Sequence, residues 1–351
     1  MTSFSFSAVP IPGRFGYGTM NLTWNPHPPP TSQAIEVLQF VTMNEKFGTK
    51  LLNGGEFYGS DNANLKLLQK FLESNSSEDN EKLIISIKGC LNEKFVPDGS
   101  KEGVARSIDN ILSFFPSPGA KGRPKILFEP ARVDITHPYN ETISYIAEYV
   151  KAGKIDGVSL SEVGIGSIQK ALSVCAILFV ELELSLTCQD ILHNGIIDEL
   201  TKNNVPVIAY SPLGRGYLTD YTVEHKDTYL DEMKDGDIRQ MCGKFAPENY
   251  KHNIVLVEKL YNYAHSKMNC SLETLALSWI LSLSENPNYK GRKITKILPI
   301  PGASTPQRIE NNLSALVTLS SDDLNEIDRI CNENPVKGLR YNEAAEAYLF
   351  A

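Results

Sequence analysis

Two side chains that can move a proton together, Tyr58 and Lys88, stand where apolar segments of the sequence end. Tyr58 lies in LLNGGEFYG at residues 51–59, and Lys88 closes the apolar run LIISIKG at 83–89. A nearby ammonium group lowers the pKa of a tyrosine, which is ordinarily about 10. Such a pair can protonate a carbonyl oxygen as hydride arrives, and the hydride must come from a cofactor. The plainer alternatives are a packed turn aromatic for Tyr58 and a buried ion pair for Lys88.

The elements that must position these residues alternate between strand-like and helix-like segments. Strands are expected at 14–20, 49–55, 83–89, 125–134, 155–161, 176–185, 205–213 and 296–304, each followed by a helical pattern. Eight such units predict an α/β fold, a single (β/α)8 TIM barrel domain spanning residues 1–351. The rival is an open doubly wound sheet, which ordinarily carries a glycine-rich phosphate loop after its first strand. The residues found there, NLTWNPHPPP, contain no such loop.

Two segments interrupt this alternation. A long polar and aromatic insertion at 214–252 follows the seventh expected strand, and the tail at 333–351 carries several aromatic residues. Loops of this length in a compact fold are usually lids or binding loops, so the insertion is expected to cover a cofactor. For the tail, two interpretations stay open: it folds back over the barrel mouth, or it is a loosely packed terminus.

The composition of the chain indicates which kinds of partner it can bind and in which cellular compartment it works. The chain has 351 residues, a net charge of −8 and a pI near 5.4, which argues against a nucleic-acid partner. Its six cysteines form no CxxC pair, so neither a disulfide framework nor a metal site is expected. The N-terminus lacks the features of a secretion signal, and no apolar run could span a membrane. A cytoplasmic location is expected, with the nucleus also open.

Polar residues gather where the expected strands end, which is where barrels of this class carry their chemistry. They are Asn53, Glu56 and Tyr58; Lys88; Glu129, Arg132 and Asp134; Ser161 and Glu162; Glu181 and Glu183; Tyr210, Ser211 and Arg215; and Gly302, Ser304, Arg308, Asn311 and Asn312. Strand alternation leaves open whether Glu181 and Glu183 point into the barrel, and whether one of them pairs with a barrel lysine.

Several motifs together resemble the aldo-keto reductases over nearly the full chain. They are GYGTMNLTW, NGGEFYG, SIKG, GKIDGVSLSEVG, VPVIAYSPLGRGYLT and ILPIPGASTPQRIENN. Within that family, NGGEFYG and the ARVD that follows the fourth strand are similar to segments of the fungal pyridoxal reductases. The resemblance implies a (β/α)8 barrel that binds NADPH or NADP+ in extended form without a Rossmann domain.

The resemblance also assigns roles to residues. It implies that Tyr58 is the proton donor and that Lys88 activates it. Cofactor contacts then fall on Gly18, Thr19 and Met20 at the pocket floor; on Ser161, Glu162 and Glu181 at the nicotinamide amide; on Tyr210, Ser211, Leu213 and Arg215 at the pyrophosphate loop and the strand before it; and on Ser304, Arg308, Asn311 and Asn312 at the adenosine end. Arg308 is expected to pair with a 2′-phosphate, which favours NADPH over NADH.

The sequence departs from the family's usual Asp, Tyr, Lys and His set at two positions. Asn53 stands at the Asp position, and Ala131 stands at the His position, with Arg132 beside it as the nearest replacement. An asparagine can hydrogen-bond Lys88 but cannot neutralise its charge. Asn53 and Arg132 are therefore further catalytic candidates, and what takes over from the missing His stays open.

The expected substrate is a small-molecule aldehyde, with pyridoxal the leading candidate because its phenol beside the aldehyde can supply a donor of its own. Reduction of other aldehydes or ketones on the same chemistry is the alternative. A second alternative, from another class, is a low-turnover NADPH-binding regulatory or sensor protein, motivated by the two departures. The preferred direction of reaction stays open, and so does the choice between a monomer and a weak homo-oligomer.

Overall fold

Short parallel strands form the centre of the molecule. The computed structural model describes residues 9–286 and 289–351; residues 1–8, which begin the segment considered above as a secretion signal, lie outside the described residues. The strands are β1 Tyr17–Gly18, β2 Leu51–Gly55, β3 Ile84–Gly89, β4 Lys125–Pro130, β5 Gly157–Val158, β6 Leu160–Ser161, β7 Val180–Glu183, β8 Val207–Tyr210 and β9 Ile297–Pro299. Neighbouring strands follow chain order, from β1 to β5 and from β6 to β9.

Hydrogen bonds join these two sets of strands into a closed ring. Between β5 and β6, the Ser159 N–H donates to Phe128 O (3.0 Å) and the Leu160 N–H donates to Phe179 O (3.1 Å). Residues 157–161 therefore act as one barrel strand. At the other edge, the Gly16 N–H donates to Pro299 O (3.1 Å), which links the start of β1 to β9. The predicted eight-stranded (β/α)8 barrel is confirmed.

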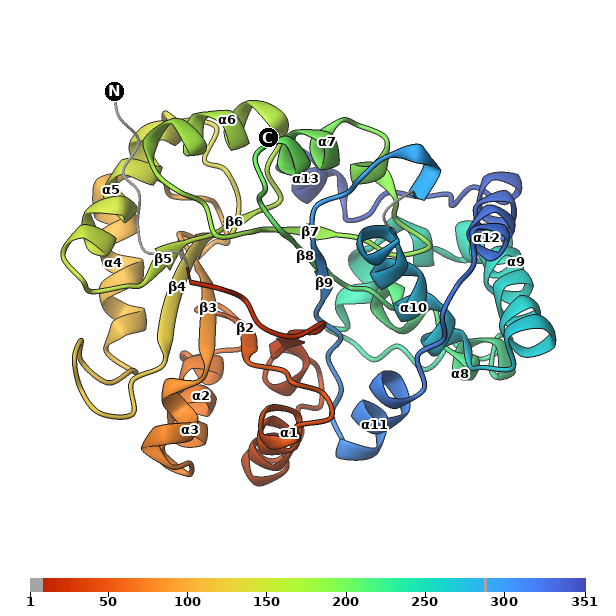
Figure 1. The fold of residues 1–351 in the computed structure, drawn as a ribbon, viewed down its shortest axis with the longest axis horizontal. Helices are drawn as coiled ribbons and strands as arrows, with labels where there is room; N and C mark the ends of the chain where they lie inside the picture. Colours follow the sequence, from red (N-terminus) through yellow and green to blue (C-terminus); the bar gives the residue numbers. More distant parts are fainter. Residues whose placement is uncertain (1–8, 287–288) are drawn as a thin grey trace.

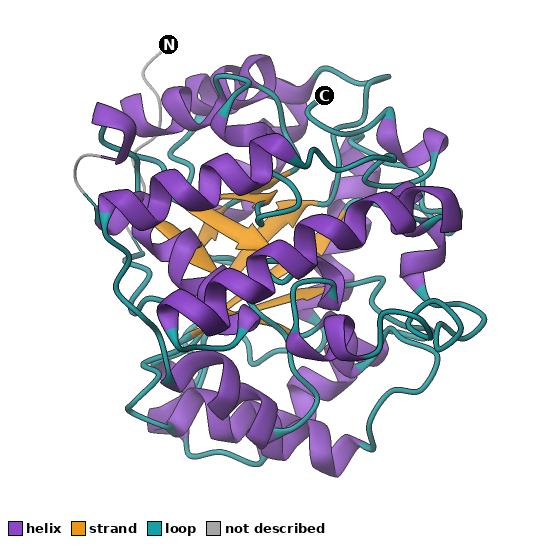
Figure 2. Cartoon of the chain, turned by 90° about the vertical axis from the view of Figure 1, so that its right-hand side faces the viewer, coloured by secondary structure: helices purple, strands orange, loops and turns teal. Residues whose placement is uncertain are grey.

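Helices surround the strands on every side (Figures 1 and 2). The α-helices are α1 Thr31–Met43, α2 Ala63–Glu73, α3 Ser77–Glu81, α4 Lys101–Leu112, α5 Tyr139–Lys151, α6 Ile165–Val174, α7 Ile196–Lys202, α8 Asp220–Glu224, α9 Pro247–Tyr263, α10 Leu272–Glu285, α11 Pro306–Ser314, α12 Ser321–Glu333 and α13 Glu343–Glu346. None of the helices in the described part of the chain is both long and apolar enough to cross a bilayer.

Strand alternation builds an apolar layer inside the barrel. A buried cluster of inward-facing side chains consists of Leu51, Ile84, Leu127, Phe179, Ile208, Leu298 and Ile300. The neighbouring residues Leu52, Ile85 and Ile126 belong instead to the large cluster between strands and helices. Because side chains on one face of a strand recur every two residues, the next inward positions toward the strand ends are polar, starting with Asn53, Glu129 and Glu181.

The insertion is shorter than expected and has a small core of its own. Helix α9 already begins at Pro247, where a proline suits the first helical turn, so the irregular part ends near residue 246. The rings of Tyr217, Tyr229, Phe245 and Tyr250 pack together, with Tyr229 and Tyr250 stacked 6.0 Å apart. This aromatic cluster fixes the insertion against α9.

Candidate active site

Four residues on β2, β3, β4 and β7 form a buried polar cluster, which lies on the C-terminal side of the apolar layer inside the barrel. Lys88 Nζ donates to Asn53 Oδ1 (2.5 Å) and to Glu181 Oε2 (2.7 Å). Asn53 Nδ2 donates in turn to Glu129 Oε1 (2.7 Å) and to Glu181 Oε2. The remaining Glu129–Lys88 separation is 3.5 Å. One ammonium, one amide and two carboxyl groups thus share a site whose members are at most 4% exposed.

The charges of this cluster act in opposite directions on its members. Burial alone lowers the pKa of Lys88, but Glu181, Tyr58 and Glu129 together outweigh burial, so the lysine pKa is raised. Burial raises the pKa of Glu129 to about 8, helped by the negative Glu181 and opposed by Lys88. Of the two carboxyl groups, Glu181 is the closer to the ammonium, at 2.7 Å against 3.5 Å for Glu129. The nearest carboxyl group to Lys88 thus comes from β7, while β2 supplies the neutral amide of Asn53.

Tyr58 is held over this cluster by its own turn. Its ring lies above Lys88, with Nζ 5.6 Å from the ring centroid. The Tyr58 N–H donates to Gly55 O (3.1 Å), and its carbonyl accepts from Thr23 Oγ1 (3.0 Å). A Cβ at Gly55 would stand 2.8 Å from the Tyr58 ring, so only glycine leaves the ring room at this point.

Burial raises the pKa of the Tyr58 hydroxyl, while Lys88 lowers it and Glu181 and Glu129 raise it. The ring is 7% exposed and is walled by Trp24 and Phe57, whose centroids lie 5.6 and 5.1 Å away. A phenol kept protonated beside an ammonium is suited to donate a proton. The structure brings Tyr58, Lys88 and Asn53 together, as their positions at strand ends predicted.

The predicted floor residues hold Asn53 from β1. Both the N–H and the hydroxyl of Thr19 donate to Asn53 O at 2.9 Å. Gly18 precedes it in β1, and Met20 starts the short 3-10 helix Met20–Leu22. A Cβ at Gly18 would lie 3.1 Å from Ile300 O. Thr19 therefore fixes the backbone on which the amide of Asn53 is aimed at Lys88.

A second buried charge cluster connects the barrel to the tail. Arg340 Nη2 donates to Glu162 Oε1 (2.8 Å), and Arg340 Nε donates to Glu183 Oε2 (3.0 Å). Lys244, from the insertion, reaches Glu183 at 3.2 Å, and Arg215 Nη2 lies 3.7 Å from the same carboxylate. Burial raises the pKa of Glu183, but these cations outweigh it and lower that pKa to about 2.

The tail lies over the barrel mouth. The Phe350 N–H donates to Glu162 O (3.1 Å), and the Gly164 N–H donates to Ala351 O (3.1 Å). The hydroxyl groups of Tyr341 and Tyr210 are 3.1 Å apart. Of the two interpretations that the sequence left open, the structure has the folded-back tail.

Arg132 faces the same mouth. Its guanidinium carbon lies 5.7 Å from the Tyr341 ring centroid, and its Nη1 donates to Ala131 O (2.6 Å). Burial lowers the pKa of Arg132, but Tyr341, Tyr210 and other neighbours, including Tyr58, raise it above the ordinary value. Ala131, at the position of the missing His, is buried and carries no polar group, and Arg132 is the residue beside it in the sequence.

The remaining cofactor candidates are distributed along the mouth and the α11 side. Ser161 presents a buried hydroxyl that no described group hydrogen-bonds. Ser211 follows β8 with a left-handed backbone (φ 48°), and Leu213 precedes the 3-10 helix that contains Arg215. The Ser304 carbonyl accepts from Gln33 (2.8 Å), and Asn311 accepts from Gln307 (2.8 Å). Arg308 is exposed on α11, one residue before Ile309, and Asn312 is half-buried on the same helix.

Some members of these clusters were not among the predicted site residues. Glu129 was seen only as a polar strand end, although its place two residues after Leu127 on the inward face could have assigned it to the site. Lys244 and Arg340 gave no local signal, because their partners lie 61 and 157 residues away. Tyr341 was also not predicted, because its partner Tyr210 lies 131 residues away in the sequence.

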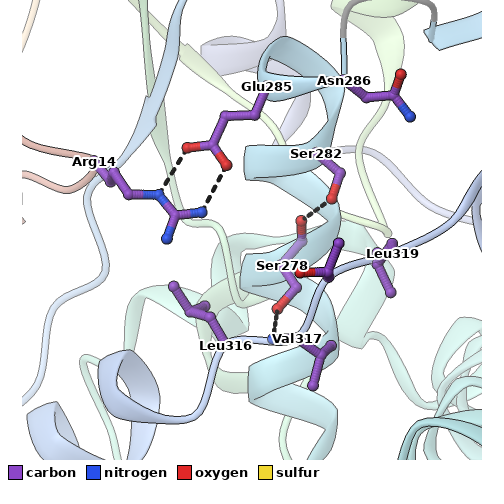
Figure 3. A pocket seen from close by; sticks show the side chains of 9 residues that line it. Arg14, Ser278, Ser282, Glu285, Asn286, Leu316, Val317 and Leu319 are labelled. Atoms are coloured by element: carbon purple, nitrogen blue, oxygen red, sulfur yellow. Dashed lines mark hydrogen bonds and ion pairs between the residues drawn. The ribbon is translucent and has the colours of Figure 1, made fainter.

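A hollow elsewhere on the surface lies at the opposite end of the barrel. It is bordered by α10, by residues 316–319 and by Arg14 (Figure 3). The guanidinium group of Arg14 forms a bidentate ion pair with Glu285, with hydrogen bonds of 2.6 and 2.7 Å. Arg14 precedes β1, and Glu285 is the last residue of α10, the helix that precedes β9, so this is the end where strands begin. In barrels of this class that end contributes to stability rather than catalysis. The described residues contain no group of His, Cys, Asp or Glu that could hold a metal ion.

The family model for the aldo/keto reductase family matches residues 14–332. The chain belongs to the aldo/keto reductase family. It is 36% identical over 342 residues to "Probable pyridoxal reductase 2" of Schizosaccharomyces pombe, covering 96% of this chain and 97% of the relative. It is also 34% identical to the "Putative pyridoxal reductase" of Saccharomyces cerevisiae, covering 94% and 96% of the two chains.

Solved structures support the same architecture for this aldo/keto reductase. A glycerol dehydrogenase from Gluconobacter oxydans superposes with a TM-score of 0.74 at 18% identity, covering 94% of this chain and 97% of the other. At that identity the likeness concerns the fold alone. Members of the family are oxidoreductases that generally use NAD(P)H and act on small-molecule carbonyl compounds, and this chain is an oxidoreductase of that family.

Proposed function

We propose that this aldo/keto reductase uses NADPH to reduce pyridoxal to pyridoxine in a reversible reaction, with Tyr58 as the proton donor and Lys88 as its activator. The observation that carries the proposal is the buried Lys88 ammonium beneath the Tyr58 ring, at 5.6 Å from its centroid. The printed names of the two fungal relatives support the choice of pyridoxal.

The chain's own residues account for the proton. In the reductive direction the aldehyde carbon gains a hydride and its oxygen gains the Tyr58 proton, which water then replaces. Lys88 stabilises the phenolate that remains, and Asn53 and Glu181 hold Lys88 in place. NADPH supplies the hydride when bound. In the oxidative direction the phenolate takes the proton back from the alcohol.

Residues around the mouth fit a bound dinucleotide. The free hydroxyl of Ser161 is a donor and acceptor suited to a carboxamide, and a buried hydroxyl without a partner is costly unless a ligand completes it. Arg308 is exposed at the start of α11, which is capped by the Thr305 hydroxyl (3.3 Å). An exposed arginine at a helix N-terminus favours a phosphate, which supports NADPH over NADH.

The walls of the mouth fit a flat, polar aldehyde. Trp24 and Phe57 flank Tyr58, and Phe95 stacks on Trp24 at 5.9 Å. Arg132 adds a cationic hydrogen-bond donor that can bind the ring oxygen beside the aldehyde of pyridoxal. Other aldehydes share the hydride chemistry, so a panel of substrates separates pyridoxal from them.

The test compares wild type with Tyr58→Phe, following NADPH absorbance with pyridoxal as substrate. We expect turnover by wild type, and a loss of about 100- to 10,000-fold in kcat for the variant, with NADPH affinity retained. If the enzyme reduced other aldehydes but not pyridoxal, the proposal that pyridoxal is the substrate would be wrong. Tight NADPH binding with no turnover on any carbonyl compound would overturn the reductase and support a regulatory protein.

A further inference from the structure

We propose that Glu181 is the counterion of the catalytic lysine, so that the negative charge absent at Asn53 has moved across the barrel from β2 to β7. Glu181 is then a positioning residue for Lys88 and Tyr58 instead of a ligand of the nicotinamide amide. This inference rests on the proposed function of Tyr58 and Lys88.

The contacts commit Glu181 to the lysine. Its Oε2 accepts from Lys88 Nζ at 2.7 Å and also from the Asn53 amide, so this oxygen is fully used. The other carboxyl group, Glu129, lies 3.5 Å from the same ammonium and contacts Asn53 instead. Lys88 and Glu181 are 4% and 2% exposed. A buried ammonium requires a close anion, and Glu181 is the closer of the two.

Asn53 is suited to this arrangement because it is neutral. Its amide donates to both carboxyl groups while its oxygen accepts from Lys88. An aspartate at this position could not donate to Glu181 and would put three carboxyl groups around one ammonium. The neutral amide of Asn53 therefore suits a site that already holds two carboxyl groups, because it hydrogen-bonds both of them as well as Lys88. In the proposed arrangement the negative charge lies on β7.

A consequence follows for the cofactor amide. With Glu181 held by Lys88, the contact predicted for it passes to Ser161, on the neighbouring strand β6 and paired with Glu181 in register. The Ser161 hydroxyl is buried and has no partner among the described residues.

The charged groups around Tyr58 determine in which direction its pKa should change in the test. They are Lys88 on β3, Glu129 on β4, Glu181 on β7 and Arg132 after β4. Since Glu181 opposes Lys88 at Tyr58, removing its charge lowers the pKa of Tyr58. Reduction needs the protonated phenol, so its rate falls as pH rises through that pKa. In Glu181→Gln this alkaline limb moves to lower pH.

The experiment compares wild type, Glu181→Gln and the double variant Asn53→Asp/Glu181→Gln. In the double variant the carboxylate returns to β2, where the Asn53 oxygen lies 2.5 Å from Lys88. We expect Glu181→Gln to lose at least tenfold in kcat at pH 7, with its alkaline limb shifted down. The double variant should recover most of the lost kcat, and its alkaline limb should return toward that of wild type. Glu273→Gln, on α10 outside the barrel, is the control for loss of a partly buried carboxylate.

Thermal unfolding without cofactor gives a second readout that needs no turnover. Glu181→Gln should melt several degrees below wild type, and the double variant should regain most of that loss. An unshifted alkaline limb with weaker NADPH binding would assign Glu181 to the cofactor and overturn the proposal. A failure of the double variant to recover would overturn it as well. If wild type itself reduces no carbonyl compound, the proposed function is wrong. The melting temperatures of the three proteins would still show whether Glu181 is the counterion of Lys88.

Discussion

At the scale of single residues, the site depends on small and neutral side chains as much as on charged ones. Gly55 gives the Tyr58 ring its room, and Asn53 connects Lys88 to two carboxyl groups. Both belong to the stretch NGGEFYG, which also contains Tyr58, the proposed proton donor. The local sequence therefore encodes Tyr58 together with the space for its ring and the amide that hydrogen-bonds Lys88.

Gly55→Ala tests how strictly the ring is placed. The added Cβ would stand 2.8 Å from the Tyr58 ring, which must then move. A displacement of about 1 Å at a reacting group can cost roughly 100-fold in rate, so kcat should fall by that order with NADPH affinity retained. Steady-state kinetics measure this. Gly166→Ala is the matched control, because open space surrounds Gly166 in α6. Equal activity of both variants would show that the ring tolerates the shift.

At the scale of elements, the tail carries the most unexpected structural role. It places Arg340 between Glu162, after β6, and Glu183, on β7, and so ties the last residues of the chain to two strand ends. The insertion meets the same carboxylate through Lys244. The two segments that interrupted the strand–helix alternation are thus joined to each other through Glu183.

Arg340→Met tests the docking of the tail. It leaves two buried carboxylates short of a cation, and breaking a buried pair in this way costs about 3–5 kcal/mol. Urea unfolding should show a loss of that order in the free energy of unfolding. The matched control is Arg329→Met on α12, which removes an exposed ion pair with Glu326 and Glu333 and should change little. If both variants unfold alike, the tail adds nothing to stability.

Sequence patterns were sufficient for the elements but not for these pairings. Apolar runs spaced along the chain predicted the barrel, and strand alternation could place Asn53 and Glu129 on the inward face. Pairings such as Arg340 with Glu183 depend on how a tail folds in space, which no local pattern records. The start of α9 at Pro247 was missed because the polar residues around it read as loop.

At the scale of the whole molecule, the barrel sets an apolar layer under a polar one. The inward cluster that includes Leu51, Leu127 and Phe179 lies beneath Asn53, Glu129 and Glu181, two residues further along the same strands. The apolar layer excludes water from below, and the tail lies over the mouth above. Charges between these layers act on one another strongly, because little solvent separates them. The pH dependence of stability should therefore report on individual buried carboxyl groups.

Glu129 and Glu183 should contribute to this dependence with opposite signs. The pKa of Glu129 is raised to about 8 from an ordinary 4.5, so the folded state holds its proton while the unfolded state releases it. Its contribution to stability is full below about pH 4.5 and is lost as pH rises toward 8. The pKa of Glu183 is lowered to about 2, so its contribution is present above pH 4.5 and is lost as pH falls toward 2.

Glu129→Gln isolates the first of these effects. Glutamine resembles the protonated acid in shape and cannot ionise, so it should remove the loss of stability between about pH 5 and 8. Relative to this variant, wild type should lose up to about 1.4 kcal/mol of unfolding free energy per pH unit in that window. Urea unfolding at half-unit pH steps measures the difference. A difference that stays constant across the window would mean that Glu129 is ionised throughout, and that Lys88 shares its charge between two carboxylates instead of relying on Glu181.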